Sequence, residues 1–322
     1  MRAVVTGCAG FIGSSLTDRL LAEGWGVLGI DSFEGYYARD IKEANLLEAR
    51  RHPAFSLVEG DLIELASSDG AMRAGGSLRE IVGSADHIYH LAAQPGVRGS
   101  WGRSFETYVR NNVLATQLLL ECAKDAGIAS FVCASSSSVY GDTATLPMDE
   151  TAECRPFSPY GVTKLASEHL ARLYARNFGL PTVSLRFFTV YGPRQRPDMA
   201  FNRFIRAALE DLPIEVFGDG SQTRDFTFVS DIVDGIVAAP AAPPGSVLNL
   251  GGGSRVTLSE ALEVLGTVMG REIRVQLSAA QAGDVKDTWA AVARAREAIG
   301  FQPKVDLASG LAAEYEWLRT TL

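Results

Sequence analysis

Residues 2–31 narrow the choice of fold more than any other part of the sequence. They read RAVVTGCAGFIGSSLTDRLLAEGWGVLGID: a short β-branched run, a glycine loop, a segment with helical periodicity, and a second apolar run that ends at Asp31. This order predicts a strand, a helix and a second strand, which together form one βαβ unit. The glycines Gly7, Gly10 and Gly13 depart by one residue from G-x-G-x-x-G, so the prediction depends on their setting between strand and helix.

The glycine loop suits a dinucleotide. Glycine permits a tight turn and lets a pyrophosphate approach backbone N–H groups at the positive end of a helix. Asp31 can accept hydrogen bonds from an adenosine ribose, and its charge repels a 2′-phosphate, so we expect NAD rather than NADP. The alternative is a packing turn that binds no ligand. Asp61 and Leu62 are candidates to border the adenine, although an aspartate at a strand end also caps helices.

Strands and helices continue to alternate beyond this unit. The expected strands lie at 55–61, 87–93, 131–137 and 182–188, and long helical stretches lie at 104–127 and 158–179. Such alternation predicts an α/β fold, a doubly wound parallel sheet of the Rossmann type with helices on both faces. The cofactor would then bind at the carboxyl ends of the strands.

The pattern changes after Phe188. Loops rich in glycine and proline, such as YGPRQRPD and FGDGSQTRDF, separate short helices there. We therefore expect an NAD-binding Rossmann domain at residues 1–188, to which 226–250 return. Residues 189–225 and 251–322 would form a smaller C-terminal substrate-binding lobe over the carboxyl ends of the strands.

Composition excludes several classes of partner. The chain of 322 residues carries a formal net charge of −8 and no lysine or arginine block, which argues against binding nucleic acid or an anionic membrane. Its four cysteines and four histidines have no metal-ligand spacing, so we expect no metal site and reduced thiols. We find no signal-peptide pattern and no apolar run of membrane length, which favours a cytoplasmic protein. Anionic ligands would be bound by individual arginines.

The stretch SPYGVTK places Tyr160 and Lys164 four residues apart at the expected start of a helix, hence on one face. A tyrosine titrates near 10, so it becomes a useful base at neutral pH only when cations stabilise its phenolate. Lys164 and the nicotinamide ring of bound NAD supply such charges. Tyr160 could then take a proton from a hydroxyl whose carbon gives hydride to NAD, while a serine of CASSSSVYG binds the reacting oxygen. The alternative is an amphipathic surface pair.

Several stretches together resemble the extended short-chain dehydrogenase/reductase family of nucleotide-sugar epimerases and dehydratases: TGCAGFIG, HLAAQPGVRGS, SSSSVYG, SPYGVTK and RDFTFVSDI. The resemblance covers nearly the whole chain and implies a C-terminal nucleotide-sugar lobe, tightly held NAD, and often a homodimer through helices near 101–126 and 158–178. It implies that Tyr160 is the catalytic base, Lys164 its partner and Ser136 the serine of the triad. The implied NAD-binding residues are Gly7, Gly10, Phe11, Ile12, Gly13, Asp31, Asp61, Leu62, Leu91, Ala92, Ala93, Tyr160 and Lys164.

The residues before VYG favour epimerisation within this family. Dehydratases carry an Asp-Glu pair there and UDP-glucuronate decarboxylases a glutamate, whereas this chain has Ser137 and Ser138. No acidic residue is then present to protonate a leaving hydroxyl. An epimerase needs none, because it oxidises C4, lets the 4-ketosugar turn over, and returns hydride to the other face.

The stretch RFFTVYGPRQRPDMAF is similar to UDP-glucuronate 4-epimerases and differs from the NPxGAH-type stretch usual in UDP-galactose 4-epimerases. A glucuronate carboxylate needs a donor, and Arg196 and Arg98 are the candidates, with the Thr189 hydroxyl nearby. A firm hold would protect the 4-keto intermediate, a β-keto acid, from losing carbon dioxide. The substrate-binding residues that the resemblance implies are Pro95, Arg98, Ser137, Ser138, Thr189, Arg196, Asn202, Val216, Arg224 and Asp284.

Arg224 in TRDF matches the phosphate-binding arginine of the family. The family usually carries another arginine just before the GD of QAGDV, where this chain has Ala280, Gln281 and Ala282, so one charged contact to the diphosphate is missing. Two alternatives to a UDP-glucuronate 4-epimerase stay open. One is a UDP-glucose/UDP-galactose 4-epimerase, and the other is a non-catalytic NAD-sensing protein of the same fold, which would have no use for a complete serine, tyrosine and lysine triad.

Overall fold

The computed structural model describes residues 1–67, 76–143, 145–253, 255–279, 281 and 283–321. Ala280 and Ala282, where the family arginine is missing, lie outside these ranges. The strands are β1 Arg2–Thr6, β2 Gly26–Asp31, β3 Phe55–Glu59, β4 His87–His90, β5 Ser130–Ser136, β6 Thr182–Phe187, β7 Val190–Tyr191, β8 Ile214–Phe217, β9 Thr223–Asp225, β10 Thr227–Phe228, β11 Ser246–Leu250, β12 Arg255–Thr257 and β13 Val275–Ser278.

The α-helices are α1 Phe11–Ala22, α2 Arg39–Asn45, α3 Leu62–Ser67, α4 Leu78–Gly83, α5 Phe105–Tyr108, α6 Ala115–Ala123, α7 Pro159–Phe178, α8 Ala200–Leu209, α9 Val229–Ala238, α10 Leu258–Met269, α11 Ala293–Ile299 and α12 Leu307–Thr321. Between α5 and α6 the chain forms a π-helical segment, η4 Val109–Leu114. The single helix expected at 104–127 is therefore interrupted. None of the helices in the described ranges combines the length and apolar character needed to cross a membrane.

The main sheet has seven parallel strands in the order β11-β6-β5-β4-β1-β2-β3. The chain builds outward from β1 to β3, then returns to the other side of β1 with β4. The order of strands therefore reverses between β1 and β4, and ligands of such sheets bind beyond the carboxyl ends at that point. The predicted α/β, doubly wound Rossmann fold is confirmed.

The strands β1 to β5 each contribute to two cores, one on either face of the sheet. Along β1, Val4 packs with α3, α4 and α6, whereas Ala3 and Val5 pack with α1 and α9. The same alternation occurs in β5, where Phe131 and Val132 belong to opposite cores. Successive side chains of a strand point to opposite faces, so a strand that is apolar throughout requires cover on both sides.

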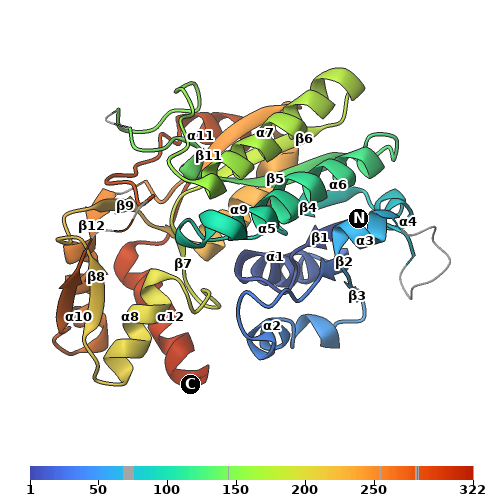
Figure 1. Cartoon of the computed structure of the whole chain (residues 1–322). Helices are drawn as coiled ribbons and strands as arrows, with labels where there is room; N and C mark the ends of the chain where they lie inside the picture. Colours follow the sequence, from blue (N-terminus) through green and yellow to red (C-terminus); the bar gives the residue numbers. More distant parts are fainter. Residues whose placement is uncertain (68–75, 144, 254, 280, 282, 322) are drawn as a thin grey trace.

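The remaining elements form a smaller lobe. Figure 1 shows α8, α10 and α12, with β8, β9 and β12, gathered beside the helices that cover the sheet. Phe201, Ile205, Leu265 and Leu311 are among the buried residues of its core. One boundary differs from the expected division: we placed all of 251–322 in the lobe, but α11 packs on β11, and both Ala295 of α11 and Phe301 just after it belong to the core of the sheet.

Candidate active site

The glycine loop follows β1 and leads into α1. Gly7 has a φ of 73°, and a Cβ there would lie 2.7 Å from the backbone nitrogen of Ala92, in the loop that follows β4. A Cβ on Gly13 would lie 2.0 Å from the Gly7 carbonyl oxygen, so neither position has room for a side chain. Gly10 precedes α1 and provides no side-chain cap. The first amides of α1 are therefore left for a ligand, as a pyrophosphate requires.

Asp31 ends β2 and is almost completely buried. Its Oδ1 accepts a hydrogen bond from the Phe33 amide at 2.8 Å, and its Oδ2 accepts one from the Ala9 amide at 3.1 Å. Lys42, also buried, extends from α2 to within 3.5 Å of Oδ1. The carboxylate is thus fixed between the glycine loop and the loop after β2. Sequence reasoning missed Lys42, because no spacing rule links a helix lysine to this aspartate.

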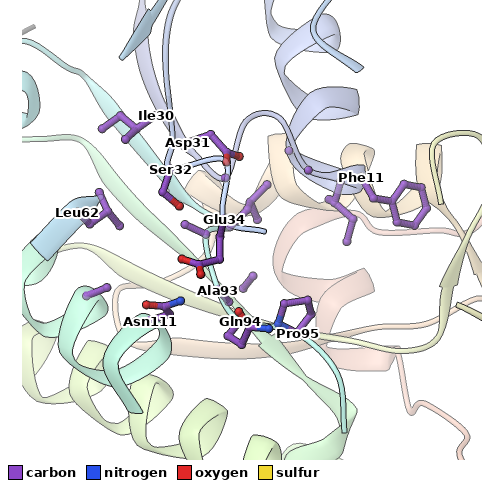
Figure 2. Close-up of a pocket in the computed structure, with 18 of the residues that line it drawn as sticks. Phe11, Ile30, Asp31, Ser32, Glu34, Leu62, Ala93, Gln94, Pro95 and Asn111 are labelled. Atoms are coloured by element: carbon purple, nitrogen blue, oxygen red, sulfur yellow. The ribbon is translucent and has the colours of Figure 1, made fainter. Parts of the chain in front are cut away.

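The glycine loop, Asp31 and Lys42 line one groove, which lies where the order of strands reverses between β1 and β4. Figure 2 shows side chains from β2, from the loop after it and from the helices beyond β3 and β4 around this space, with Asp31, Glu34, Leu62 and Asn111 among them. Every residue predicted to bind the cofactor lines the groove: Gly7, Gly10, Phe11, Ile12, Gly13, Asp31, Asp61, Leu62, Leu91, Ala92, Ala93, Tyr160 and Lys164. A close-packed glycine loop, uncapped amides and an anchored carboxylate fit an NAD dinucleotide.

Asp61 caps a helix from within the groove. It lies in the groove, and its Oδ1 accepts a hydrogen bond from the Ile63 amide at 2.8 Å, which caps α3. Its Oδ2 pairs with Arg110 at 2.7 Å. The Asp61 carboxylate is therefore engaged on both oxygens, as the Asp31 carboxylate is.

The tyrosine and lysine lie in the first two turns of α7. Ser158 caps this helix through a hydrogen bond from the Gly161 amide to its Oγ at 3.1 Å, and a proline follows at the first helical position. Lys164 is buried and its Nζ donates to the Ala134 carbonyl of β5 at 3.0 Å. Tyr160 lines both the cofactor groove and a second cavity.

Ser136 is the last residue of β5 and lines the second cavity with Tyr160. Its Oγ accepts a hydrogen bond from the Ser138 amide at 3.2 Å. A Cβ on Gly161 would lie 2.5 Å from the Ser138 carbonyl oxygen, so the start of α7 packs directly on the serine segment. The structure thus brings the three predicted catalytic residues to one end of the sheet.

Sequence reasoning missed Asn112, which supports this arrangement from η4. Its Oδ1 accepts a hydrogen bond from the Gln94 amide at 2.7 Å, and its Nδ2 lies 3.1 Å from the Gln94 carbonyl and 3.0 Å from Thr163 Oγ1. The loop after β4 is thereby tied to α7. The sequence shows only two adjacent asparagines, Asn111 and Asn112, and not which of them is buried. π-helical segments such as η4 are frequent at functional sites.

The second cavity, of about 550 Å³, lies between the carboxyl ends of the strands and the lobe. Most of the residues predicted to bind substrate line it: Pro95, Arg98, Ser137, Ser138, Thr189, Arg196, Arg224 and Asp284. Asn202 and Val216 do not. The Asn202 side chain is buried and donates to the Gln195 carbonyl at 2.6 Å, and Val216 packs in the core of the lobe. Both therefore support the wall from behind, while their neighbours Arg203 and Phe217 line it.

Arginine–carboxylate pairs surround this cavity. Arg98 from the Rossmann domain pairs with Asp284 of the lobe at 2.6 Å. Arg196 pairs with Asp198 at 3.0 Å, and Arg203 of α8 pairs with Glu215 of β8 at 3.2 Å.

Arg224 differs from these three arginines. It donates to the carbonyls of Thr223 at 2.8 Å and Lys286 at 3.0 Å, and forms no ion pair with the described residues. Because burial disfavours the charged form, the pKa of its guanidinium is lowered. An anion bound at Arg224 would compensate a cation that the protein has desolvated without a carboxylate partner.

A doubly wound domain with a dinucleotide groove, and a tyrosine–lysine pair where that groove meets a second cavity, defines a nucleotide-dependent enzyme of the dehydrogenase/reductase type. The chain belongs to the NAD dependent epimerase/dehydratase family, whose model matches residues 3–251. The predicted membership among the extended short-chain dehydrogenases/reductases is confirmed, and NAD is the cofactor of the family.

Similar proteins point to sugar nucleotides. The chain is 40% identical over 321 residues to the uncharacterized UDP-glucose epimerase YtcB of Bacillus subtilis (strain 168), covering 99% of this chain and 98% of the relative. It is 34% identical over 320 residues to the UDP-glucuronate 4-epimerase of Thermodesulfobacterium geofontis (strain OPF15), covering 99% and 96%. The crystal structure of UDP-glucuronic acid 4-epimerase from Bacillus cereus with UDP-glucuronic acid and NAD is 40% identical, with a TM-score of 0.94 over 100% of both chains.

Proposed function

We propose that the protein is an NAD-dependent 4-epimerase of a UDP-sugar that interconverts UDP-glucuronate and UDP-galacturonate. The observation that carries this proposal is the position of Tyr160, which lines both the cofactor groove and the second cavity. The Tyr160 phenol can therefore exchange a proton with the hydroxyl of a sugar that is bound in the second cavity, beside a cofactor in the groove. The relatives and the Bacillus cereus complex act on, or bind, sugar nucleotides of this kind.

NAD, when bound, takes the hydride from C4 of the sugar and returns it. Tyr160 removes the proton from the C4 hydroxyl, and the charge of Lys164, one turn further along α7, stabilises the phenolate. The Ser136 hydroxyl hydrogen-bonds the same oxygen and holds it beside the phenol. After the 4-ketosugar has turned over, Tyr160 gives the proton back, so no net redox change remains.

The charges of the second cavity favour epimerisation over dehydration. Dehydration needs a carboxyl group that can protonate the leaving hydroxyl. Among the described residues that line this cavity, the acidic ones are Asp198, Glu215 and Asp284, and each is paired with an arginine. A carboxylate whose oxygens already accept hydrogen bonds from an arginine is poorly placed to protonate a leaving hydroxyl.

The arginines suit a nucleotide with a uronate. Arg224, without a carboxylate partner, is our candidate for the diphosphate. Arg196 lines the cavity together with Tyr160 and Thr189, so it is our candidate for the sugar carboxylate. Holding that carboxylate away from alignment with the C4 carbonyl would keep the β-keto acid intermediate from losing carbon dioxide.

The experiment is to incubate the purified protein with NAD and each of a set of UDP-sugars, and to separate the products. We expect UDP-galacturonate from UDP-glucuronate. If the protein instead preferred to convert UDP-glucose to UDP-galactose, its substrate would be a neutral UDP-hexose rather than UDP-glucuronate. Binding of NAD without turnover of any sugar nucleotide would leave the NAD-sensing alternative.

We also propose a homodimer through the helices near 101–126 and 158–178. Large apolar side chains are exposed on both segments, including Val109, Leu114, Val162, Leu173 and Phe178. Burying them against a second copy would remove this surface from water. In sedimentation experiments Leu173→Glu should yield monomers, whereas Leu47→Glu, equally exposed but near α2, should not. A dimer unaffected by the first substitution would place the interface elsewhere.

The cytoplasm is our proposed location. All four cysteines are free thiols, and Cys8, Cys122 and Cys133 are buried. Unpaired thiols are typical of reducing compartments. Fractionation of the native host with an antibody against the protein would test this, and recovery outside the cytoplasmic fraction would contradict it.

A further inference from the structure

Arg196 already holds a carboxylate of its own chain. Its Nε and NH2 groups donate to Oδ1 and Oδ2 of Asp198, each at 3.0 Å, in a bidentate pair. Asp198 lines the second cavity, and Arg196 lines both cavities. A sugar carboxylate that approaches Arg196 therefore meets a guanidinium whose charge is largely balanced, and a second negative charge beside it.

We propose that Asp198 is a specificity-determining residue, which competes with the sugar carboxylate for Arg196 and so sets the balance between uronate and neutral hexose substrates. This inference rests on the proposed function. A guanidinium has five N–H donors in one plane, and Asp198 occupies the edge formed by Nε and NH2. The sugar carboxylate must use the remaining donors or displace Asp198. In either case, repulsion from the charge of Asp198 weakens its binding.

Tyr36 provides Asp198 with an alternative partner. Its hydroxyl donates to Asp198 Oδ2 at 3.2 Å, and the Arg196 guanidinium lies 5.8 Å from its ring. Burial, together with the charge of Asp198, raises the pKa of Tyr36 to about 12, so the phenol remains a donor at neutral pH. Tyr36 belongs to the loop between β2 and α2, and its hydroxyl packs against Gly96 with no room for a Cβ there. It can thus retain Asp198 when Arg196 turns to the sugar.

The principal test compares Asp198→Asn with wild type, each saturated with NAD. The ratio of kcat/KM for UDP-glucuronate to that for UDP-glucose should rise about tenfold, because removing one like charge near the carboxylate is worth about one pK unit. Calorimetry should show tighter binding of UDP-glucuronate and little change for UDP-glucose. Asp18→Asn is the matched control: Asp18 pairs with Arg194 of the same loop at 2.7 Å, and outside both cavities it should leave the ratio unchanged.

Tyr36→Phe supplies a second test. Without the Tyr36 hydroxyl, Arg196 is the one remaining partner of Asp198 among the described residues. UDP-glucuronate should therefore bind more weakly and UDP-glucose equally well. The inference is overturned if Asp198→Asn leaves the ratio unchanged or lowers it, or if Asp18→Asn raises it equally. If either Asp198→Asn or Tyr36→Phe fails to fold, as judged by circular dichroism, the other decides.

The outcome also separates this inference from the proposed function. A wild-type protein that does not epimerise UDP-glucuronate would contradict the proposed function. The calorimetric preference of Asp198→Asn for UDP-glucuronate over UDP-glucose would still support competition at Arg196, and the lack of such a preference would reject it.

Discussion

The cofactor groove and the second cavity are built in different ways. The groove is formed largely by short runs that follow successive strands, with glycines, small side chains and a carboxylate fixed by backbone amides. The second cavity is closed by side chains from both domains, and three arginine–carboxylate pairs surround it. Backbone geometry therefore defines the first site, whereas charge pairing between side chains defines the second.

This difference predicts which substitutions act generally and which act on one substrate. Changes in the groove, or where it meets the second cavity, should affect every substrate, because every reaction uses the same cofactor. Changes in the arginine–carboxylate pairs should separate charged from neutral sugars, because the pairs can be exchanged for ligand groups.

The largest effect is expected at Tyr160, which belongs to both sites. Tyr160→Phe should lower kcat by about a hundred- to ten-thousandfold for all UDP-sugars, since the acid/base hydroxyl is lost. NAD binding, measured by calorimetry, should persist because the ring remains. Tyr174→Phe in the same helix, whose hydroxyl bonds to Glu121, is the control and should retain activity. Similar turnover in Tyr160→Phe and wild type would remove Tyr160 from the mechanism.

Arg196→Ala should act on one substrate only. UDP-glucuronate should lose a charge-assisted interaction of about 1.5 to 3 kcal/mol, which is roughly ten- to hundredfold in kcat/KM, whereas UDP-glucose should be unaffected. A UDP-4-keto-pentose, detectable by mass spectrometry, should accompany the epimer once the carboxylate can rotate. The control is Arg194→Ala, whose guanidinium pairs with Asp18 instead. An equal loss for both sugars would mean that Arg196 does not bind the carboxylate.

Asp31 and Lys42 form a charge pair within the groove, and this pair offers a direct comparison with the second cavity. Wild type should prefer NAD over NADP. Asp31→Asn should reduce that preference about tenfold, because the repulsion of a 2′-phosphate is lost while Lys42 remains. Affinities of both cofactors by calorimetry would test this, with the exposed Asp40→Asn as control. An unchanged preference would mean that the backbone alone selects the cofactor.

The two regions also differ in how far the sequence predicts them. The glycine loop, Asp31 and the Tyr160–Lys164 pair lie in local patterns, where spacing along one strand or helix determines which groups share a face. Those patterns predicted the doubly wound sheet, and they predicted that the glycine loop, Asp31 and the Tyr160–Lys164 pair lie at one groove. Lys42, which lies beside Asp31, was not predicted, because no local spacing links it to that carboxylate.

The second cavity was predicted less completely for a physical reason. The pairing of Arg98 with Asp284 joins residues far apart in the chain, and only the packed lobe brings them together. Val216 was placed one residue from the wall, because alternation along β8 turns its side chain into the core and that of Phe217 to the cavity. Asp198 lies only two residues after Arg196 in the sequence, but the sequence does not show that its carboxylate faces the Arg196 guanidinium.

The smallest expected effect concerns Glu314 of α12, which supports the start of the loop that carries Arg196. It is fully buried, its Oε2 accepts a hydrogen bond from the Gly192 amide at 2.7 Å, and its Oε1 has no partner in the described part of the chain. Burial raises its pKa from 4.5 to about 8. Between these values the folded protein holds a proton that the unfolded chain releases, so this group makes the protein less stable as pH rises through that window.

Glu314→Gln removes this dependence and keeps an acceptor for Gly192. Its melting temperature should nearly match that of wild type near pH 4.5 and exceed it by up to about 8 °C at pH 8. The rise of the pKa to about 8 corresponds to roughly 4 kcal/mol at that pH, and 1 kcal/mol shifts the melting temperature of a chain of this size by about 2 °C. Asp225, whose pKa burial raises to about 7, is present in both proteins, so its effect cancels in the difference. Glu316→Gln, on the exposed face of α12, should give no such increase. If the difference between Glu314→Gln and wild type stays constant with pH, Glu314 is ionised in the folded protein and the loop is held by an anion rather than by a neutral carboxyl group.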